Sequence, residues 1–511
     1  MGMTVYRNGR PIRSRATLTM PEVGDGVATT YQSSLENALT ALSVRVLTAE
    51  RNGKFVPVGQ TRPPKGHTAV LDLWIDRVSS QASPTNPVPR EEFPKLYEAR
   101  KRKVYQAAVE SLRLNPLRPR DSRIKAFLKY EKQLGGPTKA PRVIMPPDPR
   151  FLVETGRYIH PVEHLIYRAI DRVFGFPVVT KGLNYEGVGN IFHSHWCAIS
   201  DPVAFDIDVE KMDRSFSAEL LALTHRLILC YFAGADLDEI TDLLRRQLVN
   251  QGSVKVDDGV VTYKVDGTLT SGQMNTSLAG ITAVCGILWT FMESLGVDYR
   301  YVDAGDDCTV IISRKDIPRF LAGLRPAFRQ HGFELTVSPE RRRLEEIEFC
   351  QTHPIWFPGG YRMVRNAKDA ARKDSTWLTP EPSKTAAAQW LYAVSESGLA
   401  THGGVPVLQE LYQSYSRVSE NWRKELNLTP RAARRFEQSA RRRLEEGSMK
   451  WYGAGLHHKY TEIHPLTRFS FYLAFGISPA AQYALEDHYR GLNFTWATGR
   501  GERYERVRWP I

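Results

Sequence analysis

The chain has 511 residues, of which 42% are hydrophobic and 24% charged. This balance is typical of a globular protein with several subdomains and excludes a largely disordered chain. The formal net charge of +13 favours a polyanionic partner, either nucleic acid or an acidic membrane surface. The five cysteines are scattered and never spaced C-x-x-C, which indicates a reducing compartment and no disulfide framework.

The first part of the chain divides into a loop-rich segment and a basic one. Residues 1–94 carry Pro and Gly clusters and predict an extended arm lying over other parts of the molecule. No apolar signal segment is visible at the N-terminus. In residues 95–150 Lys and Arg greatly outnumber Asp and Glu. Residues 95–114 predict a helix, residues 127–150 strands around a Gly-Gly-Pro turn, and residues 162–174 a further helix.

The middle of the chain alternates strand and helix patterns. In AFDIDVEKMDRSFS, Phe205, Ile207 and Val209 alternate with Asp206 and Asp208, which predicts a half-buried strand running into a helix. The loop TLTSGQMNTSLAG then leads into the apolar run of residues 278–292. That run is shorter than the roughly 20 residues of a membrane span and predicts a helix buried on most sides.

The remaining elements follow in the same way. YVDAGDDCTVIIS, residues 301–313, predicts a hairpin, and residues 316–335 predict a helix. Residues 347–366 predict two strands around Pro358, Gly359 and Gly360. Residues 376–511 are mostly helical in pattern, with a second basic cluster at RAARRFEQSARRR.

Two short motifs could bind metal. FHSHWC places His193, His195 and Cys197 at alternate positions, which on a strand would share one face and make a zinc site conceivable. It lacks a fourth ligand, and ordinary packing is the favoured interpretation. The adjacent Asp306 and Asp307 are compatible with a simple hairpin turn, because Gly and Asp are common there. They are also compatible with a Mg²⁺ site, because hard oxygen ligands suit that ion.

A second carboxylate strengthens the metal hypothesis. If the strand with Asp208 neighbours the hairpin, Asp208, Asp306 and Asp307 converge at one edge of a sheet. Three carboxylates around two ions form the arrangement used for in-line phosphoryl transfer. The basic region at residues 95–150 can supply Lys and Arg to hold a triphosphate.

These motifs together resemble a known family. DIDVEKMD, SGQMNTSLAG and AGDDCTVII are similar, in order and separation, to the palm motifs of viral RNA-dependent RNA polymerases. The basic stretch from FLKYEK to IYRAI resembles the fingers motif of the tombusvirus-like group of plus-strand RNA viruses, and KGLNYEG, EFCQTHPIWFPGGYRMVRN and RKRKVYQAAVESL are similar to that group. The resemblance covers residues 95–375.

The resemblance implies an α+β right-hand polymerase with fingers, palm and thumb. It implies an N-terminal arm at residues 1–94, fingers at 95–200, a palm at 201–375 with a fingers insertion at about 220–268, and a helical thumb at 376–511. The activity implied is template-directed RNA synthesis from ribonucleoside triphosphates with Mg²⁺, for which Mn²⁺ can substitute. The partners implied are template and product RNA and a viral membrane-anchored replication protein, in the host cytoplasm.

The resemblance also implies roles for single residues. The metal ligands would be Asp208 and Asp306, with Asp307 beside them, whereas Asp206 would be a polar strand residue. Asp213 would lie near the ribose 2′-hydroxyl, and Cys350 and Gln351 would steady the growing strand. The nucleotide would also meet a flexible loop and a basic channel, formed by Ser271, Gly272, Asn275, Thr276, Lys129, Glu131, Lys132, Lys139 and Arg142.

Two positions depart from the family pattern. Gly280 stands where the family usually has the Asn that partners the ribose-sensing Asp, so we expect weaker rejection of 2′-deoxynucleotides. Only Arg341, Arg342 and Arg343 stand where many relatives have a Lys that protonates pyrophosphate. Because Arg does not readily give up a proton, we expect it to stabilise charge instead.

Two other functions stay open. A reverse transcriptase shares the palm chemistry but usually has a different residue pair before its Asp-Asp. A basic RNA-binding protein accounts for the net charge but not for the spaced acids. A nucleotide-hydrolysing helicase is disfavoured because the chain has no GxxxxGK[ST] loop.

Overall fold

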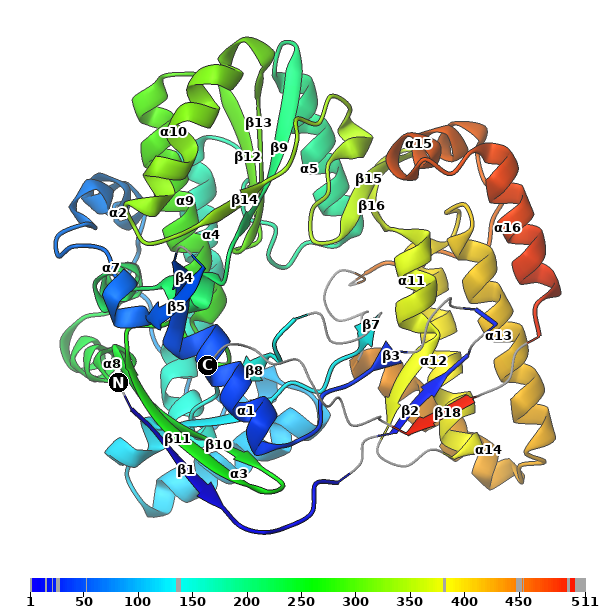
Figure 1. The fold of residues 1–511 in the computed structure, drawn as a ribbon, viewed down its shortest axis with the longest axis horizontal. Helices are drawn as coiled ribbons and strands as arrows, with labels where there is room; N and C mark the ends of the chain where they lie inside the picture. Colours follow the sequence, from blue (N-terminus) through cyan, green and yellow to red (C-terminus); the bar gives the residue numbers. More distant parts are fainter. Residues whose placement is uncertain are drawn as a thin grey trace.

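The computed structural model describes residues 2–13, 16–20, 22–23, 28–51, 53–134, 139–379, 383–446, 453, 455–493 and 497–500. Helices and strands are mixed throughout, in agreement with the predicted α+β class. Figure 1 shows two parts side by side, one built around two sheets and the other around helices near the C-terminal end.

The central sheet has four antiparallel strands in the order β12-β13-β9-β14. These are Tyr299–Asp303, Asp307–Ser313, Pro202–Val209 and Leu335–Val337. β12 and β13 form the predicted hairpin, with Asp303 opposite Cys308. β9 alternates as predicted only toward its end, because Val203, Ala204 and Phe205 are all buried.

Helices cover this sheet and form the main core with it (Figure 1). The apolar run becomes α9, Thr276–Leu295, which begins after Asn275 and ends at Gly296 in the left-handed conformation. By length and composition α9 could cross a membrane, but 78% of its apolar window is buried inside the protein, as predicted for a core helix. Gly286 of α9 allows close packing, because a Cβ there would lie 2.5 Å from Trp74.

The other helices of this part pack around α9 and the sheet. They are α2 (Asp72–Ser79), α4 (Pro149–Phe174), α5 (Tyr185–Ala198), α6 (Met212–Ser215), α7 (Ala218–Leu229), α8 (Gly234–Arg245) and α10 (Ile317–Arg329). α4 begins at Asp148, which accepts a hydrogen bond from the Arg150 amide, and ends at Gly175 with positive φ. The helix predicted at 162–174 is confirmed, although α4 starts earlier, and the helix predicted at 316–335 is confirmed only up to Arg329, because Leu335 already begins β14.

A second, five-stranded sheet joins distant segments in the order β1-β11-β10-β6-β8. Its strands are Gly2–Arg7, Gly259–Asp266, Val249–Val256, Ile124–Leu128 and Val143–Ile144. β10 runs parallel to β6, so the segment near 250 belongs with the basic region. The predicted helix at 95–114 is α3, Ala99–Leu114, and the predicted Gly-Gly-Pro turn lies outside the described residues.

The N-terminal segment is more structured than a loop-rich arm. Besides β1 it contains β2 (Ala16–Thr19), β3 (Ala28–Thr29), α1 (Leu35–Leu42), a π-helix at Ser43–Leu47, β4 (Thr48–Arg51) and β5 (Lys54–Pro57). It still runs between the two parts (Figure 1). β3 pairs with β7 (Gln133–Leu134), and β2 pairs with β17 (Thr376–Thr379) and β18 (Ala497–Arg500).

The C-terminal part is mostly helical, as predicted. Its helices are α11 (Ala367–Asp374), α12 (Lys384–His402), α13 (Leu408–Glu425), α14 (Pro430–Glu446), α15 (Pro465–Phe475) and α16 (Pro479–Gly491). The hairpin β15 (Thr352–Phe357) and β16 (Gly360–Arg365) turns at Pro358 and Gly359, as predicted. It packs against α5 and α15 and so joins the two parts.

The zinc hypothesis for FHSHWC fails, because the motif lies on the helix α5 and not on a strand. His195 is buried against Phe176, whereas His193 stacks on Tyr361 and Cys197 is exposed. The buried His195 therefore lies on a different helix face from the exposed His193 and Cys197. Ordinary packing accounts for His195 and His193.

Candidate active site

The carboxylates of the motifs lie at adjoining strand ends. β9 pairs with β13, and Asp208 stands directly opposite Asp307. The amide of Val209 donates to the carbonyl oxygen of Asp306 over 2.9 Å, which fixes the end of β9 against the hairpin turn. The predicted proximity of the Asp208 strand and the hairpin is therefore confirmed.

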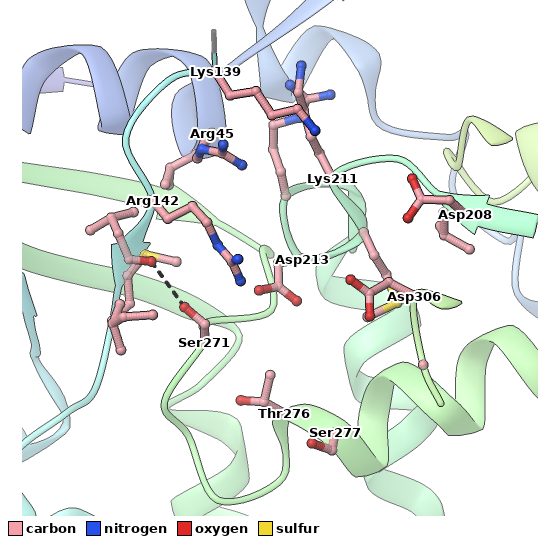
Figure 2. Close-up of a pocket in the computed structure, with 18 of the residues that line it drawn as sticks. Arg45, Lys139, Arg142, Asp208, Lys211, Asp213, Ser271, Thr276, Ser277 and Asp306 are labelled. Atoms are coloured by element: carbon pink, nitrogen blue, oxygen red, sulfur yellow. Dashed lines mark hydrogen bonds between the residues drawn. The ribbon is translucent and has the colours of Figure 1, made fainter. Parts of the chain in front are cut away.

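Asp208 and Asp306 face a cavity of about 450 Å³. Figure 2 shows both side chains directed toward the same space as Asp213, with Arg45 and Lys139 across that space and Lys211 between Lys139 and the acids. The charged and hydroxyl groups lining the cavity are Arg45, Lys139, Arg142, Lys211, Arg214, Asp208, Asp213, Asp306, Ser271, Thr276 and Ser277. Acids and bases thus meet across one space, which suits a ligand carrying both phosphates and cations.

Burial and mutual repulsion make it unfavourable for the clustered carboxyl groups to be ionised together. Burial, followed by repulsion from Asp306, raises the pKa of Asp213 to about 7 and that of Asp307 to about 6. Burial and then Asp306 also raise the pKa of Asp208, while Lys139 lowers it. Like charges this close oppose joint ionisation, and a cation among them would reverse the effect. The cluster is therefore poised to attract positive charge.

The predicted basic channel is only partly gathered here. Lys139 and Arg142 line the cavity, and in Figure 2 the Arg142 guanidinium lies beside Asp213. Glu131 does not line it but lies 3.5 Å from Arg142 and 3.6 Å from Lys129, so it joins the two cations.

Lys132 lies elsewhere. It is not among the cavity-lining residues, and its ammonium donates to the carbonyl oxygen of Lys373 and lies over the Trp390 ring at 5.8 Å. Burial lowers its pKa to about 8. Sequence position alone did not show that this side chain turns toward the C-terminal part.

Only part of the predicted nucleotide loop lines the cavity: Ser271 and Thr276 do, whereas Gly272 and Asn275 do not. The Ser271 hydroxyl donates to the Val143 carbonyl over 3.2 Å (Figure 2). The Thr276 hydroxyl donates to the Thr270 carbonyl over 2.8 Å. Gly272 has φ of 111° and a Cβ there would lie 3.0 Å from Pro146, so this position requires glycine.

Asn275 does not reach the cavity. Its side chain is fully buried and donates to Gln247 over 2.9 Å, with His225 3.3 Å away. The structure therefore gives it a packing role beneath the loop, at the start of α9.

Among the charged and hydroxyl-bearing residues that line the cavity, four were not predicted from the sequence: Arg45, Lys211, Arg214 and Ser277. Arg45 comes from the π-helix of the N-terminal segment, and its Nε and Nη2 donate to the Ala140 carbonyl over 2.9 and 2.7 Å. No local pattern distinguishes Arg45, which is half-buried, from the other arginines of the chain. Lys211 and Arg214 lie within the DIDVEKMDR stretch, so their closeness in sequence to Asp208 could have predicted that they line the same cavity.

Asp206 is a structural residue, as predicted. Its carboxylate accepts hydrogen bonds from Arg341 (2.9 Å), the Thr309 hydroxyl (3.1 Å) and the Glu348 amide (3.1 Å). Arg341 is thus committed to Asp206. Arg342 pairs with Glu340, and Arg343 lies 4.0 Å from Glu346, so all three arginines have acidic neighbours.

Cys350 and Gln351 form a strained turn beside the acids. Both have positive φ, at 50° and 60°. A hydrogen bond from Cys350 favours the charged form of Asp307 and lowers its pKa, against the larger effect of burial. The Gln351 side chain accepts a hydrogen bond from Lys373 over 2.6 Å.

Gly280 faces Met212. A Cβ at Gly280 would lie 2.8 Å from the Met212 Cε, so the missing side chain leaves room that the methionine fills. Met212 lines the cavity next to Asp213.

The described residues include no set of three His, Cys, Asp or Glu side chains gathered closely enough to hold a metal ion. The donor chemistry nevertheless fits a hard divalent cation. Asp208 and Asp306 present carboxylate oxygens to one cavity, and the raised pKa of Asp208 marks a place where positive charge is favourable.

Comparison with known proteins identifies the class. The sequence matches the family described as viral RNA dependent RNA polymerase over residues 3–497, so the chain belongs to this family. The resemblance inferred from the motifs is confirmed.

Three curated relatives are each named RNA-directed RNA polymerase. The chain is 33% identical to that of Tobacco necrosis virus (strain A), over 95% of this chain and 65% of the relative. It is 33% identical to that of Turnip crinkle virus, over 96% and 61%. It is 34% identical to that of Tomato bushy stunt virus (strain Cherry), over 89% and 53%. The chain thus spans about half to two thirds of the length of these relatives.

Proposed function

We propose that this chain copies an RNA template into RNA from ribonucleoside triphosphates, in the replication of a viral RNA genome. The observation that carries the proposal is that Asp208 and Asp306, at neighbouring strand ends, face Arg and Lys side chains across one cavity. Membership of the viral polymerase family supports the same activity.

The acids are proposed to hold two Mg²⁺ ions, for which Mn²⁺ can substitute. Asp208 and Asp306 are the principal ligands, with Asp307 beside them. When bound, the ions supply activation of the attacking 3′-hydroxyl and neutralisation of the leaving pyrophosphate. The protein's part is to keep these carboxylates at the rim of the cavity, at the end of β9 and at the turn into β13, two strands whose inner residues are buried.

The opposite side of the cavity is proposed to bind the triphosphate. Arg142 and Arg45 offer planar donor groups that suit phosphate oxygens, and Lys139 and Lys211 act as point charges. Glu131 holds Arg142 and Lys129 in place. This assignment moves Lys132 and Asn275 from direct contact with nucleotide to support of the surrounding structure.

Sugar recognition is proposed to depend on Asp213 and on the Ser271–Thr276 loop. With a pKa of about 7, Asp213 can accept or donate a hydrogen bond to a 2′-hydroxyl near neutral pH. Because Gly280 offers no side chain, Asp213 has no asparagine partner from α9 at that position.

The right-hand layout is proposed with fingers at 95–200 plus the insertion at about 220–268, palm at 201–375, thumb at 376–511 and an arm at 1–94. The pairing of β10, which lies within residues 220–268, with β6, which lies within residues 95–200, supports the assignment of residues 220–268 to the fingers. Cys350 and Gln351 are proposed to steady the product strand, and Arg431, Arg434 and Arg435 of α14 to contact its backbone. Location in the host cytoplasm, bound to membranes through a viral replication protein, completes the proposal.

The test is incorporation of labelled ribonucleotides on a short single-stranded RNA template with Mg²⁺ or Mn²⁺. The wild type is compared with Asp306→Ala and with Asp298→Ala, an exposed acid whose side chain is 70% accessible. Product from wild type and Asp298→Ala, but not from Asp306→Ala, is expected. RNA binding by all three with no product would favour a non-enzymatic RNA-binding protein.

A further inference from the structure

The turn that carries Asp306 is held by a buried carboxylate that the motifs do not include. Asp303, the last residue of β12, is fully buried. Its Oδ1 accepts a hydrogen bond from the Gly305 amide over 2.8 Å, and its Oδ2 accepts one from the Tyr301 hydroxyl over 2.5 Å. Both oxygens are engaged inside the protein, so this carboxylate is not among the groups that face the cavity.

The hydrogen bond to the Gly305 amide acts on the backbone directly next to Asp306. Gly305 has φ of 110°, a conformation that other residues rarely adopt, and it directly precedes Asp306. The Asp306 carbonyl in turn accepts the hydrogen bond from Val209, next to Asp208. The orientation of the turn therefore decides where both Asp306 and the end of β9 lie.

The main chain of Asp303 is also anchored. Its amide donates to the Val178 carbonyl over 2.9 Å, and its own carbonyl accepts from the Thr180 amide over 3.0 Å. The ring of Tyr301 stacks on Phe174 at the end of α4, with 5.7 Å between centroids. Asp303 thus connects the turn, through its carboxylate, to the segment that follows α4, through its main chain.

We propose that Asp303 is a positioning residue that sets the affinity of the Asp208–Asp306 rim for divalent cations, acting through the Gly305 amide. This inference rests on the proposed function of the rim. Groups that orient metal ligands without touching the metal commonly change affinity by about 10-fold to 100-fold when they are removed.

The experiment measures Mn²⁺ binding to the full chain without RNA, by electron paramagnetic resonance of the free ion, alongside thermal unfolding. Asp303→Ala removes both hydrogen bonds, and we expect its Mn²⁺ dissociation constant to rise about tenfold or more. Asp303→Asn keeps an oxygen for Gly305 and presents an amide to the Tyr301 oxygen, so we expect affinity close to that of wild type. Tyr301→Phe, which keeps the Gly305 bond, should lie between them.

Asp121→Ala is the matched control. Asp121 is also buried and accepts a backbone hydrogen bond, from the Arg118 amide over 2.9 Å, but it belongs to another part of the chain. It should lower the melting temperature without changing Mn²⁺ affinity. If Asp303→Ala behaves like Asp121→Ala, the carboxylate is only structural and the inference is overturned. Should Asp303→Ala not fold, a loss of Mn²⁺ affinity of about tenfold in Asp303→Asn, which keeps the bond to the Gly305 amide, would overturn it.

Asp306→Ala separates this inference from the proposed function. Loss of Mn²⁺ binding in Asp306→Ala with unchanged binding in Asp303→Ala would leave the function standing and refute the positioning role. Wild-type binding retained in Asp306→Ala would refute the cation site itself. RNA synthesis by the wild type, measured in parallel, reports on the function independently of either result.

Discussion

Asp213 offers a test of the electrostatics of the cavity through folding stability. Burial and repulsion from Asp306 raise its pKa from 3.8 to about 7, although Arg142 acts in the opposite direction. A carboxyl with a raised pKa in the folded state opposes folding wherever it must be ionised. Its penalty is therefore complete above pH 7 and fades as the pH falls toward 4.

The size follows from the two pKa values. Their separation corresponds to about 4 kcal/mol at pH 8 and to under about 2 kcal/mol at pH 5, as upper limits. Replacing Asp213 by Asn keeps the shape and removes the charge. The Asp213→Asn variant should therefore be more stable than the wild type, and clearly more so at pH 8 than at pH 5.

The assay is urea unfolding of both proteins at the two pH values, with chelator present to remove divalent cations. Asp298→Asn, at an exposed position, serves as the control and should change stability little at either pH. A gain for Asp213→Asn that is equal at pH 5 and pH 8, or a loss at pH 8, would refute the account of this carboxyl.

Three further predictions concern neighbouring residues. Arg45→Gln should raise the KM for nucleotide by about tenfold with a smaller effect on kcat, because it removes a cavity cation and its anchor on Ala140; steady-state kinetics on one template measures this. Asp206→Ala should destabilise folding by about 3–5 kcal/mol, measured by urea unfolding, because it leaves the Arg341 charge without its partner. Gly280→Asn combined with Met212→Ala should increase the kcat/KM preference for ribonucleotides over 2′-deoxynucleotides, and an unchanged preference would refute the role given to Gly280.

The elements nearest the catalytic motifs could be predicted because local pattern and tertiary packing agree there. The hairpin around Asp306, the strand of Asp208 and the core helix α9 each have a strong period or an unbroken apolar run. The strand on which the zinc alternative for FHSHWC depended was wrong for the opposite reason, although the favoured interpretation, ordinary packing, holds. The alternating His and Cys fit a strand, but Asn184 caps a helix that carries the motif.

The composition of the cavity was less predictable because several of its groups arrive from distant segments. Arg45 precedes the Ala140 carbonyl that it contacts by almost a hundred residues, and nothing in its local sequence announces the contact. Lys132 and Asn275 lie inside motifs that do line the cavity in part, yet their side chains turn away from it. A motif fixes the course of the backbone, whereas the direction of a long or buried side chain depends on which partners the fold supplies.

The rim of acids is unfavourable in the absence of cations, so neighbouring interactions must hold it in place. Asp206 lies on β9 with Asp208, and its carboxylate accepts hydrogen bonds from Arg341, Thr309 and Glu348. Asp303 ends β12 just before the turn, and its carboxylate accepts hydrogen bonds from Tyr301 and Gly305. These bonds lie next to the strand ends at which burial, and then repulsion from Asp306, raise the pKa of Asp208 and of Asp307. The aspartates of these strands thus differ: the carboxylate oxygens of Asp206 and Asp303 are hydrogen-bonded inside the protein, whereas Asp208 and Asp306 face the cavity. That division, more than the number of aspartates, is what distinguishes a site prepared for cations from a polar turn.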